Sequence, residues 1–174
     1  NDYLSTSVTG TGVLSETEWS VFTVMMQDGS QAQNGVFSWG FDGFNRASLI
    51  ATDNDSITFM GTRNADPSGK SSAPQPAGWD NNYHTLYGYL NSANDGEINV
   101  DGTMIDSWTN MTYNPDFSTN STMSIGRDNT FAYYLEGDIA ELVLFKRAPS
   151  AEERTQIVCY FHKKYGITVS TSCD

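Results

Sequence analysis

The chain has 174 residues, and its 21 acidic against 9 basic residues give a formal net charge of −12. This length favours one domain with a hydrophobic core, and 38% hydrophobic residues are too many for a disordered chain. The negative charge argues against nucleic acid as a partner, because phosphate binding needs clustered lysine and arginine. No apolar run approaches the roughly 20 residues of a membrane helix, so we expect no membrane insertion.

Features near the two ends of the chain bear on its cellular location. It starts Asn1-Asp2-Tyr3 without a methionine or a secretory leader, as expected for a mature chain or a monomeric module of a larger protein. Its two cysteines, Cys159 and Cys173, are either one disulfide that ties down the C-terminal tail or two free thiols. We expect the disulfide, because the acidity and the few lysines are typical of a secreted or cell-surface protein.

Most of the sequence consists of short apolar or alternating segments between turn signals, a pattern that predicts strands. The predicted strands cover residues 19–26, 36–41, 47–52, 56–62, 83–90, 97–100, 122–126 and 137–145. Asp53-Asn54-Asp55 predicts a tight hairpin, since Asn and Asp tolerate the left-handed backbone of such turns. Residues 64–82 are rich in Pro, Gly and Ser and predict a long loop, which in a compact domain often carries function.

The hydrophobic period then changes from that of strands to that of a helix. Ser150 and Glu153 have the spacing of a capping box, apolar residues follow at helical spacing, and Gly166 stands where a C-terminal cap belongs. We therefore predict one helix over about residues 150–165. Many strands followed by one late helix indicate an all-β, two-sheet antiparallel β-sandwich, in a single domain over residues 1–174.

Two stretches of the sequence carry a resemblance. The first joins Asn-Tyr-His-Thr-Leu-Tyr at 82–87 to Ile-Asn-Val-Asp-Gly at 98–102, and the second runs from Met-Ser-Ile-Gly-Arg at 123–127 to Lys-Tyr-Gly at 164–166. Together they resemble the laminin-G-like, concanavalin-A-like jelly-roll superfamily in its bacterial form. Tyr83 replaces the usual Trp, and Ala140 stands where Asp is frequent. The resemblance implies two curved sheets, sugar binding on the concave face or at the rim loops, and in many members calcium.

Some relatives of this fold are glycoside hydrolases or polysaccharide lyases, so an enzyme is an alternative. Hydrolysis needs two carboxylates on one strand face, but between Glu97 and Asp101 the middle position is the amide Asn99. A lyase could use His84 with a nearby tyrosine, yet His84 holds the place of a structural histidine in the resemblance. We expect no catalytic residues.

The binding interpretation rests on aromatic rings and arginines, because rings stack on sugars and the guanidinium fork matches sulfate or carboxylate groups. The candidate sugar-binding residues are Trp39, Phe44, Arg46, Arg63, Trp79, Asn81, Arg127 and Tyr133. Each has a structural alternative: the tryptophans could pack in the core or pin the long loop, and the arginines could pair with nearby aspartates. The arginines favour an anionic or galactan-type polysaccharide.

A structural Ca²⁺ is a separate hypothesis, because calcium takes six to eight oxygen ligands and the chain has several acidic turns. The resemblance places calcium near the last strand, which makes Asp138 the best candidate ligand, and Asp28 in an Asp-Gly turn is a second.

The sequence thus predicts a non-catalytic carbohydrate-binding module appended to a secreted polysaccharide-degrading enzyme or surface protein. Acidity and few lysines favour a saline, marine habitat and an algal polysaccharide. A protein-interaction, adhesion or spacer module of the same fold is the first alternative, and a hydrolase or lyase is the second.

Overall fold

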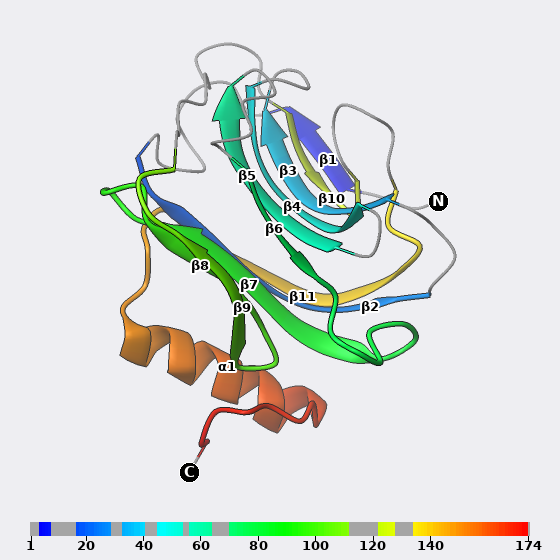
Figure 1. Cartoon of the computed structure of the whole chain (residues 1–174). Coiled ribbons are helices and arrows are strands. Elements are labelled where there is room, and N and C mark those ends of the chain that lie inside the picture. The colour runs from blue at the N-terminus through cyan, green and yellow to red at the C-terminus, as the bar shows by residue number, and fades with distance from the viewer. Residues whose placement is uncertain are drawn as a thin grey trace.

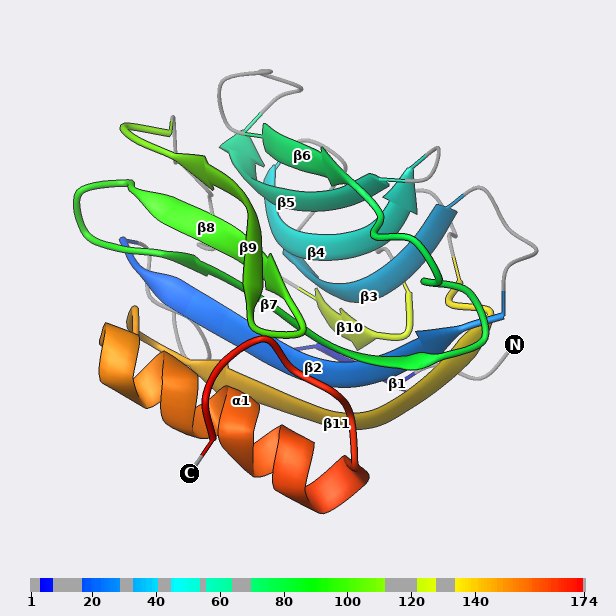
Figure 2. The ribbon, with the colours of Figure 1, turned by 60° about the horizontal axis from the view of Figure 1, so that its bottom comes forward.

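The strands of the computed structural model form two antiparallel sheets that pack face to face (Figure 1). The six-stranded sheet has the order β1-β10-β3-β4-β5-β6, and the five-stranded sheet has the order β11-β2-β7-β8-β9. Helix α1 lies along the outer face of the five-stranded sheet (Figure 2). The predicted β-sandwich with a C-terminal helix is therefore confirmed.

The structure describes residues 4–7, 17–28, 33–40, 45–53, 56–63, 70–111, 122–127 and 134–173. Its strands are β1 (Leu4–Ser7), β2 (Trp19–Gln27), β3 (Gln33–Gly40), β4 (Asn45–Asp53), β5 (Ser56–Arg63), β6 (Lys70–Pro74), β7 (Tyr83–Leu90), β8 (Gly96–Val100), β9 (Thr103–Trp108), β10 (Thr122–Ile125) and β11 (Gly137–Phe145), and its helix is α1 (Ala151–Tyr165). Within these residues, no helix is both long and apolar enough to cross a bilayer.

Each strand predicted from the sequence is present, but the predicted loop over residues 64–82 is in part wrong. It contains β6, an edge strand that pairs with β5 from Met60↔Lys70 to Ser56↔Pro74. Lys-Ser-Ser-Ala-Pro has no alternating apolar pattern that predicts a strand, and the strand is held by pairing with β5, by burial of Ala73 and by a hydrogen bond between the Ser72 and Thr58 hydroxyls. A proline is tolerated at such an edge.

The centre of the sandwich is an aromatic stack that joins the two sheets. The ring of Trp19 on β2 stacks on Phe59 of β5, with centroids 4.5 Å apart, and Phe59 stacks on Trp108 of β9 at 5.0 Å. Strand β2 is buried on both faces, because Trp19 points into this core while Phe22 packs against α1. This double burial explains why its sequence is apolar along nearly its whole length.

A two-residue turn links β8 to β9. Asp101 has φ 49° and Gly102 has φ 79°, the left-handed pair that a type I′ hairpin requires. A Cβ atom at residue 102 would lie 2.6 Å from the Thr171 Oγ1 atom of the C-terminal tail. Glycine is therefore needed at this position both for the turn and for the close approach of the tail.

Helix α1 begins with the predicted capping box. The Ser150 side chain accepts a hydrogen bond from the Glu153 amide, while the Glu153 carboxylate accepts one from the Ser150 amide. Gly166 ends the helix in the left-handed conformation. Val158 and Phe161 are buried against Phe22 and Tyr87 of the sheet, so the helix is held mainly by this apolar face.

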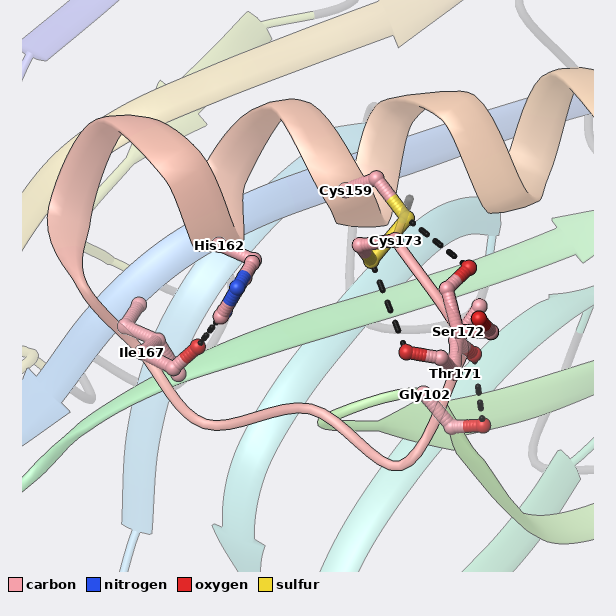
Figure 3. The surroundings of a disulfide bond; sticks show 7 residues. All are labelled: Gly102, Cys159, His162, Ile167, Thr171, Ser172 and Cys173. Carbon is pink, nitrogen blue, oxygen red and sulfur yellow. Dashed lines mark hydrogen bonds between the residues drawn. A yellow bond between two sulfur atoms is a disulfide. The ribbon is translucent and has the colours of Figure 1, made fainter.

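The C-terminal tail turns back along α1 and is joined to it by the predicted disulfide between Cys159 and Cys173 (Figure 3). His162 Nδ1 donates to the Ile167 carbonyl at 2.6 Å where the chain leaves the helix. Further along, the Ser170 amide donates to the Asp101 carbonyl at 2.8 Å. The tail thus bridges the helix and the β8–β9 turn.

Candidate functional site

Three basic residues meet at one end of the six-stranded sheet, the end towards which the β5 arrow points in Figure 1. Arg46 is the second residue of β4 and pairs with Thr62, and Arg63 is the last residue of β5. Lys70 is the first residue of β6 and pairs with Met60. Antiparallel pairing therefore brings together cations that are separated in sequence. We call Arg46, Arg63 and Lys70 the cationic end.

Arg46 pairs with Thr62, the residue before Arg63, so the two arginines lie one position apart on adjacent strands. Arg46 alternates with the buried core residue Ala47, whereas Arg63 has the same pleat phase as Phe59 in the core. The two positions consequently belong to opposite sides of the sheet at the same end.

Small hydroxyl residues line the outward face of the six-stranded sheet. Ser38, Ser48 and Thr58 alternate with core residues on β3, β4 and β5, and Ser124 of β10 pairs with Ser38. All four are at most 1% exposed. A ligand on this side of the sandwich would therefore meet the strand ends rather than the middle of the face.

Both tryptophans proposed as sugar platforms are core residues, which corrects the sequence-based expectation. Trp39 is 0% and Trp79 is 3% exposed, so neither offers a ring face to a ligand. The Trp79 indole N–H donates to the Gln27 side-chain carbonyl at 2.9 Å, and its ring stacks on His84 at 4.7 Å. Trp79 therefore pins its loop to the sandwich.

Arg127 lies at the far end of β10 from Thr122, whose row across the sheet contains Arg46. At ~3.3 Å per residue the two rows are about 16 Å apart, so Arg127 is not part of the cationic end. Its guanidinium lies over the Tyr134 ring, 5.3 Å from the centroid. Asn81 is exposed, but it lies beside the end of β2, where its amide donates to the Gln27 carbonyl at 2.7 Å.

Two of the predicted sugar-binding residues, Phe44 and Tyr133, lie outside the described residues. The side chains of Arg46, Arg63 and Lys70 are likewise not described, and the cationic end is defined by the strand positions of these three residues.

The two candidate calcium ligands come to the same end of the five-stranded sheet. The Asp28 amide donates to the Glu136 carbonyl at 2.9 Å, and Asp138 pairs with Met26. The Asp138 carboxylate accepts a hydrogen bond from the exposed Tyr83 hydroxyl at 3.3 Å. Among the described residues, no group of three or more His, Cys, Asp or Glu side chains is arranged to hold a metal. A calcium site remains a prediction.

The carboxylates weighed as catalytic residues are engaged in structural contacts. Glu97 accepts a hydrogen bond from the Tyr87 hydroxyl at 2.6 Å and lies 3.5 Å from Arg154 Nε beneath α1. Burial and the Glu97 carboxylate raise the pKa of Tyr87 well above its ordinary value. In the β8–β9 turn, the Asp101 carboxylate accepts a hydrogen bond from the Thr85 amide at 2.8 Å.

His84 has the structural role that the resemblance implied. Its Nδ1 lies 2.6 Å from the Asp101 carboxylate while its ring covers Trp79. Burial alone would lower the pKa of His84, but the hydrogen bond and charge of Asp101, with the carbonyls of Gly78 and Trp79, raise it. The histidine therefore joins the Trp79 loop to the β8–β9 turn.

The family described as "Concanavalin A-like lectin/glucanases superfamily" matches residues 1–153 of the chain. The chain belongs to this superfamily. Among curated proteins no match was found.

Solved structures with a fold similar to that of this chain come from several kinds of protein. The NanB sialidase of Streptococcus pneumoniae matches with a TM-score of 0.68 at 20% identity, over 88% of this chain and 26% of that chain. The Ruminococcus gnavus IT-sialidase CBM40, solved bound to alpha2,3 sialyllactose, matches with a TM-score of 0.67 at 14% identity, over 88% of this chain and 95% of that chain. The botulinum neurotoxin serotype G binding domain matches with a TM-score of 0.63 at 12% identity, over 93% of this chain and 41% of that chain. These likenesses show the fold, and the chain spans about a quarter of the sialidase.

The sequence analysis missed Lys70, because the segment that contains it has the composition of a loop. The pairing of Met60 with Lys70 places this lysine at the same end of the sheet as the two arginines, and such a pairing leaves no signal in sequence periodicity.

Proposed function

We propose that this chain is a non-catalytic carbohydrate-binding module that recognises an anionic polysaccharide, of a sulfated or uronic galactan type, through its cationic end. The observation that carries the proposal is the gathering of Arg46, Arg63 and Lys70 at one end of one sheet. They are three of only nine basic residues in a chain of net charge −12. The guanidinium fork of an arginine matches a sulfate or carboxylate group, and a local group of positive charges can attract an anion although the chain as a whole is negative.

The comparisons support a binding module rather than a catalytic domain. The chain has nearly the same extent as the IT-sialidase CBM40, whose length it covers to 95%. Each of three pockets in the described part of the chain is lined by at most one carboxylate, whereas glycoside hydrolysis of the usual type needs two. The disulfide fits an oxidising compartment, so we place the module in a secreted or surface protein.

A charge-removing variant tests the proposal. Arg46→Gln combined with Arg63→Gln should weaken binding to sulfated or uronic polysaccharides by at least about tenfold, since charge-assisted hydrogen bonds are the strong ones. Affinity electrophoresis in polysaccharide-containing gels measures this. The matched control is Lys146→Gln combined with Lys163→Gln, which removes the same charge from exposed positions elsewhere. Equal retardation of both double variants would contradict a role for the cationic end.

A protein-interaction or adhesion module is a second candidate, favoured by an apolar pocket of about 440 Å³ at the edge of the sandwich. Leu4, Ile125, Leu135 and Ile139 are among the residues that line it, and Leu4 is 71% exposed. Exposed apolar surface of this kind is typical of protein contacts. If this candidate is right, Leu4→Glu abolishes adhesion of the parent protein while polysaccharides leave the wild-type chain unretarded.

A further inference from the structure

Strand β11 forms one edge of the five-stranded sheet, and no described strand pairs with its outer side (Figure 2). It is nine residues long. Its inward side chains Ile139, Leu142 and Leu144 pack against the main core, whereas Val143 and Phe145 pack with the residues beneath α1. An edge strand presents a row of backbone N–H and C=O groups that a further strand can pair with.

An apolar pocket of about 440 Å³ lies on the inner side of this edge, between the two sheets. Leu4 of β1 and Ile125 of β10 line it from one sheet, and Ile139 and Leu142 line it from β11. The register of β11 against β2 shifts between Ile139 and Glu141. This irregularity keeps Ile139 and Leu142 on the same side of the strand, although they are three positions apart. The first half of β11 therefore has its pocket on the inner side.

A second apolar pocket, of about 350 Å³, lies on the outer side of the same strand, between β11 and α1. Val143 and Phe145 line it from the strand, and Ile157 and Tyr160 line it from one side of the helix. Tyr160 is 45% exposed. The second half of β11 therefore has its pocket on the outer side.

The two pockets match the way in which a strand distributes its side chains. Successive residues of a strand point to opposite faces, so a segment paired with β11 sends alternate side chains inward and outward. Recognition by strand addition takes its affinity from backbone hydrogen bonds and its specificity from pockets for alternate side chains. A segment that fills both pockets has outward apolar residues beside Val143 and Phe145, and inward apolar residues beside Ile139 and Leu142.

The charges along the edge determine the direction of the partner. Glu136 and the exposed Asp138 lie where β11 begins. The exposed Lys146 follows its last residue, and beyond it Arg147 is paired with Glu153 through hydrogen bonds of 2.6 and 2.7 Å. The edge is therefore negative at its beginning and positive at its end. Since every strand pair in both sheets is antiparallel, a complementary partner has an acidic residue first and a basic residue last.

We infer that β11 binds an extended segment of another protein as an added antiparallel strand. The segment has two outward apolar residues, then two inward ones, and a basic residue at its C-terminal end. A second copy of β11 does not fit, because antiparallel pairing brings the carboxylates of Asp138 and Glu141 to the apolar outer pocket. Two chains of net charge −12 also repel each other. The inference does not rest on polysaccharide binding, because the cationic end lies on strands of the other sheet.

The probe for the test is the acetylated and amidated peptide Glu-Phe-Thr-Val-Val-Thr-Leu-Lys, titrated into the ¹⁵N-labelled chain and followed by NMR. We expect saturable shifts of the backbone amides of residues 139–145, and none along β9, the other edge of the same sheet. The control peptide has its Glu and Lys exchanged and so keeps the composition. It should bind at least about threefold more weakly, since each exposed ion pair contributes only modestly.

Two variants of the chain locate the peptide. Tyr160→Ser removes an exposed ring from the outer pocket and should raise the Kd about tenfold, because apolar contact area is lost. Met104→Ser, which removes a 56% exposed side chain from β9, is the matched control and should bind as the wild type does. The Arg46→Gln, Arg63→Gln double variant should also bind the peptide normally, so failure of the proposed function would leave this result intact.

Three outcomes would overturn the inference. The first is the absence of saturable shifts with the peptide, and the second is a set of shifts that follows β9 instead of β11. The third is an equal Kd for the Tyr160 and Met104 variants. Dimerisation of the peptide-free chain in sedimentation experiments, with the amides of residues 139–145 shifting as its concentration rises, would assign the edge to a second copy and would likewise contradict the inferred partner.

Discussion

At the level of single residues, the structure shows that several groups considered for binding or catalysis hold the fold instead. Trp79, His84 and Asp101 form a connected set in which an indole stacks on an imidazole and the imidazole meets a carboxylate. Sequence alone leaves open whether a loop tryptophan stacks on sugar or packs inward. The buried hydrogen bond from Trp79 to Gln27 decides for packing.

The role of Trp79 is tested by Trp79→Phe, which keeps a ring but removes the indole donor. The Gln27 side-chain oxygen then loses its short hydrogen bond and keeps the longer one from Gln75 Nε2 at 3.4 Å, so we expect the free energy of unfolding to fall by about 1 kcal/mol. Polysaccharide binding should stay as in the wild type. Urea unfolding measures the first and affinity electrophoresis the second. Tyr83→Phe, which removes an exposed hydroxyl, serves as the control. Loss of binding with unchanged stability would show that Trp79 is a ligand platform after all.

The His84–Asp101 pair predicts a pH dependence of stability. The pKa of His84 is raised above its ordinary 6.5, so its stabilising contribution is full below pH 6.5 and is lost as the pH rises through the folded-state value. Urea unfolding across this range should therefore show stability falling with pH. His84→Phe keeps the stack on Trp79 and should flatten that slope. The same slope in wild type and variant would disprove the assignment.

At the level of elements, features that depend on a few neighbouring residues could be predicted from the sequence, whereas the pairing of distant strands could not. The capping box at Ser150, the end of α1 at Gly166 and the Asp101-Gly102 turn follow from side-chain and backbone preferences over a few residues. Strand β6 and the placing of Arg46 and Lys70 at the same end of the sheet depend on which strands become neighbours, and tertiary packing selects these neighbours. The sequence could therefore predict the helix, eight of the eleven strands in the described part of the chain and the candidate arginines, but not β1, β6, β9 or the cationic end.

The disulfide that joins the C-terminal tail to α1 gives a prediction at the level of elements. Replacing both Cys159 and Cys173 with Ser should lower the free energy of unfolding by about 3 kcal/mol, because a cross-link over a loop of this length restricts the unfolded chain. Urea unfolding of the oxidised wild type and the double variant measures the difference. For comparison, Ser150→Ala removes the helix cap alone and should cost about 1 kcal/mol. Equal stability of wild type and double-serine variant would show that the disulfide does not contribute.

At the level of the whole molecule, the β-sandwich was predictable because the resemblance covered its second half and strand periodicity its first. The proposed binding region could only in part be predicted from the sequence. Trp39 alternates with Ser38 on one strand, and nothing in that pattern says which face is buried. The register of the six-stranded sheet makes the assignment: Trp39 faces the core, while the hydroxyl face leaves only the strand ends to a ligand.

The central claim is that this chain binds an anionic polysaccharide without degrading it. The most direct test is native affinity electrophoresis of the wild-type chain against neutral, uronic and sulfated polysaccharides, with and without EDTA, while polymer viscosity is followed in parallel. We predict retardation by a uronic or sulfated polymer, weaker at high salt, with no loss of viscosity; sensitivity to EDTA would add calcium to the site. Migration unaffected by every polymer, or a fall in viscosity, would contradict the account.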